Sequence, residues 1–334
     1  METKKKRVYK LKTWPKVLFV LIIIGCIAFY YGNKYYQEYL YEQTNEYKLL
    51  QEGYSADDVS AMLAKLSDEQ EKDILNRDYN EFIPRFIECK YFMYKNLDDY
   101  LNQVITKDED FFKYHGTTGY DYDSIVSLVN VHGDEAYYSG TLTTDLTKGA
   151  GMIANKHFKL GEYIPSDLVD VGWKYRLGGE SDNIKISSEA YDAFLKMWDA
   201  ANEEGIYLLI ISGYRSYTEQ QEVYDEYKNS KGEAYADAIA SHAQYSEHQT
   251  GLAIDMYSKE CTSSSTFKDS KTYAWLIANS YKYGFILRYP DKKESITGYK
   301  YESWHFRYLG VDLATKVYNE GITYDEYYAY YLDN

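Results

Sequence analysis

The chain has 334 residues, with 37 Lys or Arg against 52 Asp or Glu, and a formal net charge of −15. Its apolar content of 45% is enough for a buried core, which excludes a chain that is disordered throughout. Residues 1–16 hold seven of the basic residues and one Glu, so the remainder carries 30 basic and 51 acidic residues, and this polyanionic body excludes nucleic acid as a partner.

The first predicted element is an apolar helix. Between Lys16 and Lys34 lie the 17 uncharged residues VLFVLIIIGCIAFYYGN, which reach about 26 Å as a helix at about 1.5 Å per residue. Aromatic residues flank this run, as in membrane interfaces, and the basic residues before it place the N-terminus in the cytoplasm. We therefore predict that residues 1–36 form a cytoplasmic tail and a single-pass anchor in the cell membrane, with the rest of the chain extracellular.

Two other interpretations of the apolar segment stay open. Residues 23–26 (IIGC) match a lipobox, so the chain could be a lipoprotein modified at Cys26, although the apolar run continues past this cysteine. A cleaved signal peptide is the third interpretation, but no small-x-small cleavage site follows the run.

Residues 37–125 carry helical signals. Ser55 precedes two aspartates as a helix cap does, a second helical run begins at Asp68, and apolar residues follow each start at helical spacing. No catalytic constellation lies in this stretch, so we predict a helical stalk or spacer module over 37–125. A linker region over 126–154 separates it from the last predicted domain, 155–334.

The C-terminal part alternates between helices and strands. We expect helices over 188–204, from 218 through the region of residue 227, and over 272–283 and 311–319. We expect strands over 206–211, 252–256, 285–288 and 304–308. The order lacks a regular βαβ rhythm, so the predicted fold class is α+β: a small domain with a central antiparallel sheet flanked by helices.

Two motifs in this domain carry chemistry. In SEHQTGLAIDM (246–256), strand alternation puts Leu252 and Ile254 on one face and Asp255 on the other, and Gly251 allows a turn that brings His248 round to the Asp255 face. A buried carboxylate on an apolar strand is expensive unless it is paired or binds a metal.

The second motif is ESWHFR (302–307), in which His305 follows Glu302 by three residues. Residues three apart on a regular strand face opposite sides, so a shared cleft requires a bend before Trp304. With that bend, His248, Asp255 and His305 form a zinc site with an open fourth position, which is typical of catalytic zinc. Glu302 is then the candidate general base.

At these residues the sequence resembles the VanY-type zinc D-alanyl-D-alanine carboxypeptidases, from about residue 155 to 317. Four blocks in family order carry the resemblance: SGYRSYTEQQ (212–221), SEHQTGLAIDM (246–256), YGFILRYP (283–290) and ITGYKYESWHFRYLG (296–310). The family's SxHxxGxxxD and ExxH spacings are both intact.

The resemblance implies Zn²⁺ as the cofactor, with His248, Asp255 and His305 as ligands. It also implies catalytic roles for Glu302 and for Arg215, which in the family contacts the scissile carbonyl and its oxyanion. Ser246 and Gln221 match substrate-proximal positions. The implied substrates are peptidoglycan stem peptides, from which the enzyme removes the C-terminal D-amino acid at the outer face of the bacterial membrane.

Other functions remain open at this point. An L,D-carboxypeptidase acting on tetrapeptide stems shares the same ligands, and so does an endopeptidase. A non-catalytic cell-wall-binding module is expected to lack a ligand or Glu302, and both are present. A structural zinc domain would need a fourth protein ligand, for which Cys261 is the nearby candidate.

Overall fold

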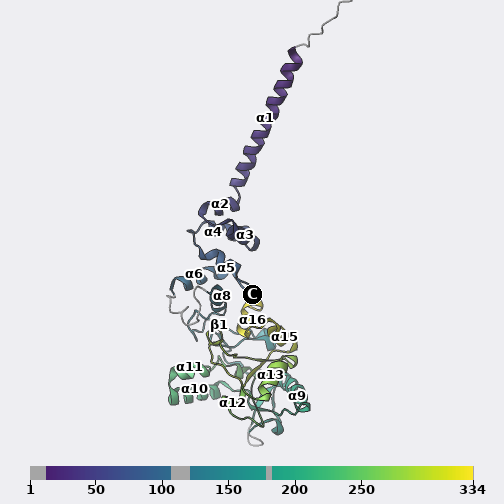
Figure 1. Cartoon of the computed structure of the whole chain (residues 1–334). Helices are drawn as coiled ribbons and strands as arrows, with labels where there is room; N and C mark the ends of the chain where they lie inside the picture. The colour runs from purple at the N-terminus through teal and green to yellow at the C-terminus, as the bar shows by residue number, and fades with distance from the viewer. Residues whose placement is uncertain (1–12, 107–120, 178–182, 334) are drawn as a thin grey trace, which may run out of the picture. The chain divides into compact units, whose positions relative to one another are not determined.

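The computed structural model describes residues 13–106, 121–177 and 183–333. The chain divides into two compact units, residues 1–97 and residues 98–334. The division into stalk, linker and peptidase domain at residues 125 and 154 remains a prediction. Figure 1 shows the chain coloured from its N-terminus to its C-terminus, with many of its helices labelled.

The first element is helix α1 (Thr13–Glu42), the long apolar helix in Figure 1. Its 18-residue apolar window has a mean hydropathy of 2.0, and none of its residues is buried. Thirty residues at about 1.5 Å each give roughly 45 Å, which exceeds the hydrocarbon core of a bilayer. By length and composition α1 can therefore cross a membrane, as the predicted anchor requires, and a signal sequence would have the same properties. The basic residues 1–12 lie outside the described part of the chain.

Short helices make up the rest of the first unit. They are α2 (Asn45–Glu52), α3 (Ala56–Lys65), α4 (Asp68–Leu75), α5 (Phe82–Glu88) and the 3₁₀ turn η1 (Tyr94–Asn96). The predicted helix starts are confirmed: Ser55 accepts a hydrogen bond from the N–H of Asp58, and Ser67 forms a reciprocal capping box with Gln70. Leu49, Met62, Ile74 and Phe86 are almost fully buried in this unit.

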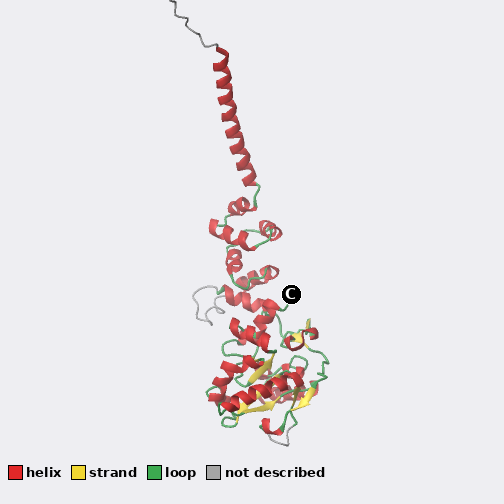
Figure 2. Ribbon diagram, turned by 90° about the vertical axis from the view of Figure 1, so that its right-hand side faces the viewer, coloured by secondary structure: helices red, strands yellow, loops and turns green. Residues whose placement is uncertain are grey.

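The second unit is built on a four-stranded antiparallel sheet in the order β5-β6-β8-β7. Its strands are β5 (Leu208–Ser212), β6 (Ala253–Ser258), β7 (Phe285–Leu287) and β8 (His305–Tyr308). Figure 2 shows these strands among helices, and the predicted α+β class with a central antiparallel sheet is confirmed.

The helices of the second unit come before, between and after these strands. α6 (Leu97–Thr106) begins at the boundary between the units. The others are α8 (Tyr122–Asn130), α9 (Ser188–Glu203), α10 (Tyr217–Lys231), α11 (Glu233–Ile239), α12 (Ser264–Phe267), α13 (Lys271–Asn279), α14 (Glu294–Thr297), α15 (Val311–Glu320) and α16 (Tyr324–Tyr331). The 3₁₀ turns are η2 (Leu146–Gly151), η3 (Trp173–Tyr175), η5 (Glu247–Thr250) and η6 (Ser280–Tyr283).

Two smaller strand pairs lie outside the main sheet. β1 (Leu142–Thr143) pairs in parallel with β2 (Phe158–Lys159), and β3 (Leu168–Asp170) pairs antiparallel with β4 (Lys185–Ser187). The sequence predicted neither pair, because strands of two or three residues are too short to show a periodic pattern.

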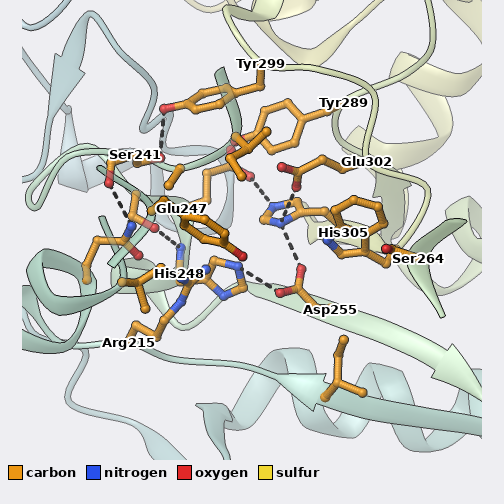
Figure 3. Close-up of a pocket in the computed structure, with 18 of the residues that line it drawn as sticks. Arg215, Ser241, Glu247, His248, Asp255, Ser264, Tyr289, Tyr299, Glu302 and His305 are labelled. Atoms are coloured by element: carbon orange, nitrogen blue, oxygen red, sulfur yellow. Dashed lines mark hydrogen bonds and ion pairs between the residues drawn. The ribbon is translucent and has the colours of Figure 1, made fainter. Parts of the chain in front are cut away.

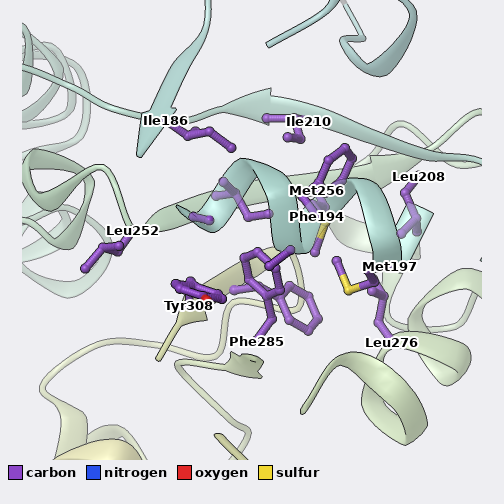
Figure 4. Packing of buried hydrophobic residues seen from close by; sticks show 14 of the residues in the cluster. Ile186, Phe194, Met197, Leu208, Ile210, Leu252, Met256, Leu276, Phe285 and Tyr308 are labelled. Atoms are coloured by element: carbon purple, nitrogen blue, oxygen red, sulfur yellow. The ribbon is translucent and has the colours of Figure 1, made fainter. Parts of the chain in front are cut away.

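The core of this unit lies between α9 and one face of the sheet. Phe194 and Met197 of α9 pack with Leu208, Met256 and Phe285 from three different strands, all nearly inaccessible to solvent (Figure 4). The opposite face of β6 carries Asp255 and is free to build a polar site, which fits the alternation of side chains along a strand.

The predicted bounds of most elements in this unit are close to the observed ones. The strand predicted over 206–211 begins two residues later, because the N–H of Ile206 donates to the carbonyl of Ala201 and still belongs to the end of α9. Gly205 takes the left-handed backbone that this helix end requires (φ 75°). The predicted helix over 272–283 is α13 followed by η6, and it ends at Gly284 (φ 88°) as expected.

Candidate active site

The three predicted metal ligands come together on the polar face of the sheet. Asp255 on β6 lies directly opposite His305 on β8 in the antiparallel register, and His248 comes from turn η5 just before β6. One ligand atom from each residue lies within 4.8 Å of the other two. The two imidazole rings are 4.9 Å apart and nearly perpendicular (Figure 3).

Two local features of the backbone make this meeting possible. Gly251 (φ 71°) ends η5 in the left-handed conformation, and a Cβ there would come within 2.9 Å of the Leu168 side chain. Ser303 and Trp304 form a turn that lets the N–H of His305 donate to the Glu302 carbonyl at 3.3 Å. The bend that the sequence requires before Trp304 is therefore present, and it brings Glu302 and His305 into one cleft.

Each histidine is oriented by a hydrogen-bond acceptor on its outer nitrogen. Nδ1 of His248 lies 2.6 Å from the carbonyl oxygen of Gly213 and donates a hydrogen bond to it. Nε2 of His248 is therefore unprotonated, and it lies 3.5 Å from Asp255. Nδ1 of His305 faces Asp255 at 3.1 Å, and its Nε2 faces a carboxylate oxygen of Glu247 at 3.5 Å. This arrangement fits metal-binding histidines, whose second nitrogen is held by a carbonyl or carboxylate.

The charges at the site favour a bound cation. Burial opposes ionisation of Asp255, yet the two histidines together hold the pKa of its carboxyl well below the usual range. Burial and the nearby Arg215 lower the pKa of His248 to about 4, so this imidazole is neutral at pH 7. His305 differs, because Asp255 and Glu247 outweigh its burial and raise its pKa to about 9. The carboxylates around His305 thus favour a positive charge in the middle of the cluster.

The donor set also fits zinc. Oδ1 of Asp255 is buried and lies 3.1 Å from Nδ1 of His305 as an ion pair, without the alignment of a hydrogen bond. Two atoms that approach closely without a hydrogen bond are placed as two ligands of one ion would be. Two imidazole nitrogens and one carboxylate oxygen are common zinc ligands, and three protein ligands leave a fourth position open for water or substrate.

Glu302 lies next to the cluster without belonging to it. Its carboxylate is 3.7 Å from Nδ1 of His305, and only 7% of the residue is exposed. Burial raises the pKa of Glu302 to about 8. A carboxyl whose pKa lies near the working pH can both accept and return a proton, as a general base and acid must.

Arg215 follows β5 and supplies the nearby positive charge. Its backbone N–H donates to the carbonyl of His248 at 3.2 Å, which ties the arginine to η5. Burial lowers the pKa of the guanidinium, while Asp255 and Glu302 act in the opposite direction. Its Nε–H is buried and has no hydrogen-bond partner among the described residues. The guanidinium therefore retains a donor for a ligand in the cleft.

Comparisons with known proteins place this chain in a family. Residues 183–311 match the family model described as VanY, D-alanyl-D-alanine carboxypeptidase. A D-alanyl-D-alanine carboxypeptidase of Enterococcus faecium is 30% identical over 239 residues, which cover 70% of this chain and 74% of that protein. The chain belongs to the VanY-type carboxypeptidase family.

Two further comparisons each cover slightly more than half of this chain. The protein YodJ of Bacillus subtilis (strain 168) is 40% identical over 179 residues, 53% of this chain and 66% of that protein. The structure of the LdcB LD-carboxypeptidase superposes with a TM-score of 0.52 at 38% identity and covers 57% of this chain and 91% of that one. The match thus spans slightly less than two thirds of YodJ.

The two residues predicted to lie near the substrate, Ser246 and Gln221, differ in their surroundings. Ser246 is buried at the start of η5 and accepts a hydrogen bond from the N–H of His248 at 3.3 Å. Gln221 points along α10 and donates to Asp225 at 3.0 Å. Its neighbour Gln220 lines the cleft instead and donates to the Ser241 carbonyl at 2.8 Å. Consecutive helix residues differ by about 100° in direction, so the spacing of this motif alone could not tell which glutamine faces inward.

The site opens into a cavity of about 450 Å³, and several of its walls were not predicted. The Tyr289 ring lies 4.9 Å from the His305 ring at a tilt of 39°, and Tyr299 shares a 2.8 Å hydrogen bond with Ser241 (Figure 3). Glu247 stands behind His305. Its position next to the predicted ligand His248 was a usable signal, because metal-bound histidines commonly have a carboxylate partner, but the structure pairs Glu247 with His305 instead. No sequence pattern distinguished Tyr289 and Tyr299, because the chain contains 42 tyrosines.

Proposed function

We propose that this chain is a zinc carboxypeptidase that removes the C-terminal D-amino acid from peptidoglycan stem peptides at the outer face of the bacterial membrane. One observation carries the proposal: an open His₂Asp cluster shares one cleft with a buried carboxylate, Glu302, and with the guanidinium of Arg215. Relatives named D-alanyl-D-alanine carboxypeptidase support the substrate class.

The metal would be held by Nε2 of His248, Nδ1 of His305 and a carboxylate oxygen of Asp255. When bound there, zinc supplies Lewis-acid chemistry: it polarises a carbonyl and makes water acidic enough to ionise near pH 7. Glu247 and the Gly213 carbonyl keep the two imidazoles in the tautomers that present these nitrogens.

The remaining steps belong to residues of the chain. Glu302 takes a proton from the attacking water and later returns it to the leaving amine of the terminal D-amino acid. Arg215 donates to the scissile carbonyl oxygen, where negative charge grows during the attack. Ser246 and Gln221 are proposed as substrate-proximal residues, and the place of Gln220 in the cleft adds it to this set.

The second candidate is an L,D-carboxypeptidase acting on tetrapeptide stems. The similarity to the LdcB LD-carboxypeptidase, at 38% identity, favours it specifically. Both activities use the same metal ligands and the same base, so they differ only in which residue precedes the scissile bond.

The proposed location is supported by α1. We propose that this helix stays in the cell membrane as a single-pass anchor with residues 37–334 outside, where stem peptides are exposed. Residues 37–125 would act as a spacer, 126–154 as a linker and 155–334 as the peptidase domain. Lipidation at Cys26 is the alternative mode of attachment.

The deciding experiment incubates the full chain in detergent, loaded with zinc, with defined stem peptides. One ends in D-Ala-D-Ala, one is the tetrapeptide ending in L-Lys-D-Ala, and one is a cross-linked dimer. Release of one D-Ala from the pentapeptide, followed by mass, is the expected result. Cleavage of the tetrapeptide alone identifies an L,D-carboxypeptidase, and cleavage of the dimer an endopeptidase. If no peptide is cut, the chain is a wall-binding module.

A further inference from the structure

A buried network of charges lies behind the metal site. The carboxylate of Glu247 is inaccessible to solvent, and one of its oxygens, Oε1, accepts hydrogen bonds from Nε of Arg288 at 2.7 Å and from Arg307 at 2.9 Å. Its other oxygen, Oε2, faces Nε2 of His305 at 3.5 Å. The two arginines thus occupy one oxygen of Glu247 and leave the other for the histidine.

The network continues into the last helix of the described chain. The two terminal nitrogens of Arg288 bind both carboxylate oxygens of Asp325 in a bidentate pair. Asp325 lies in the first turn of α16, which a capping box between Thr323 and Glu326 begins. Asn155 supports Asp325 from a distant loop by donating to its Oδ1 at 2.8 Å.

The charges of this network balance. Glu247 and Asp325 carry two negative charges, Arg288 and Arg307 carry two positive ones, and each of the four residues is at most 2% exposed. Removing one partner from such a buried set leaves an uncompensated charge, which is strongly unfavourable. Each remaining group must then reorient toward the partners that are left.

We propose that Asp325 is a positioning residue for the metal site, acting through Arg288 and Glu247 on His305. The proposal rests on the proposed metal-dependent function. Because Asp325 holds both terminal nitrogens of Arg288, the Nε–H of this arginine binds Oε1 of Glu247, and Oε2 stays directed at His305. Asp325 lies beyond the segment that matches the family model, residues 183–311, so α16 becomes a functional part of the domain.

An asparagine at position 325 tests this link with little change of shape. Its amide NH₂ would meet a donor of Arg288 where a carboxylate oxygen now accepts, and the network would gain a net positive charge. Arg288 would then compete with His305 for Oε2 of Glu247. Loss of an outer partner of a metal ligand, here Glu247, typically weakens metal binding by about 10–100-fold, and Asp325 lies two residues beyond Glu247 in this chain of contacts. We therefore expect a loss of about tenfold for Asp325→Asn.

Glu326→Gln is the matched control. Glu326 is the next residue of the same helix and is equally buried, but it pairs with Lys293 at 3.0 Å and with Thr323, neither of which belongs to the network. Because the side-chain oxygen of glutamine can still accept from Thr323, the substitution removes the ion pair with Lys293 and should leave the metal site unchanged.

The measurements are made on the full chain without any substrate. Zinc affinity is determined by chelator competition, and the geometry of the site by the visible absorption of the cobalt(II)-substituted protein. We expect Asp325→Asn to bind zinc about tenfold more weakly and to shift the cobalt spectrum, with Asp325→Glu restoring part of the affinity. Glu326→Gln should match the wild type in both measurements.

The outcomes separate this inference from the proposed function. If the wild type fails to bind zinc, the proposed function itself fails. If the wild type binds zinc and Asp325→Asn has the same affinity and spectrum, or if Glu326→Gln loses as much affinity, only the positioning role is refuted. Should Asp325→Asn not fold, Asp325→Glu carries the test, because its displaced carboxylate must alter the cobalt spectrum if the link exists.

Discussion

Replacing Glu302 by Gln should stabilise the metal-free protein while removing its activity. Glutamine has the shape of a protonated glutamate but cannot ionise. The pKa of Glu302 is about 8 in the folded chain because of its burial, against 4.5 for the ordinary group. The folded state therefore keeps a proton that the unfolded state has lost at neutral pH, and the stability of the wild type falls as the pH rises from about 4.5 toward 8.

The size of the effect follows from this window. Each pH unit between the two pKa values corresponds to about 1.4 kcal/mol, so the advantage of Glu302→Gln should grow by about 3 kcal/mol from pH 5 to pH 7. For a unit spanning residues 98–334, this amounts to a gain in Tm of about 6–12 °C. Below pH 4.5 the two proteins should melt together.

The assay is thermal unfolding in the presence of a chelator at several pH values, followed by turnover of the zinc-loaded proteins. The variant should retain zinc, because Glu302 is not a proposed ligand, and should lose about 10²–10⁴-fold in turnover. Glu260→Gln, at an exposed site, is the control for a change of charge alone. If the variant melts at or below the temperature of the wild type at pH 7, burial does not raise the pKa of Glu302. If its turnover is undiminished, another group is the base.

Three further predictions concern the ligands, the oxyanion and the anchor. The full chain should bind one zinc ion, and Ala at His248, Asp255 or His305 should abolish binding; full occupancy in all three variants, measured by elemental analysis, would exclude this site. Arg215→Ala should keep the metal but lower turnover by about 10²–10³-fold, and an unchanged rate would remove Arg215 from the mechanism. The intact mass of the natural protein should include residues 1–36, whereas a mass that begins at a lipidated Cys26 would identify a lipoprotein.

The elements that carry the site could be predicted from the sequence, because their signals act over short distances. Ser216 and Glu219 form the capping box that starts α10, and Gly284 ends the helical segment before β7. The alternation of side chains along β6 correctly predicted that Asp255 faces the cleft and Ile254 faces the core. Each of these signals involves residues a few positions apart, whose geometry is determined by the backbone of a single helix, strand or turn.

The charged residues that surround Glu247 behind the proposed metal site could be identified only from the tertiary structure. Arg288 and Arg307 meet Glu247 across 41 and 60 residues of sequence, and Asp325 joins them from α16, a helix that was not predicted. These partners depend on the register of β6, β7 and β8, in which a slip by one residue would turn every side chain to the other face. That register is selected by burying the whole apolar face of the sheet against α9, so it is a property of the packed domain and of no single motif.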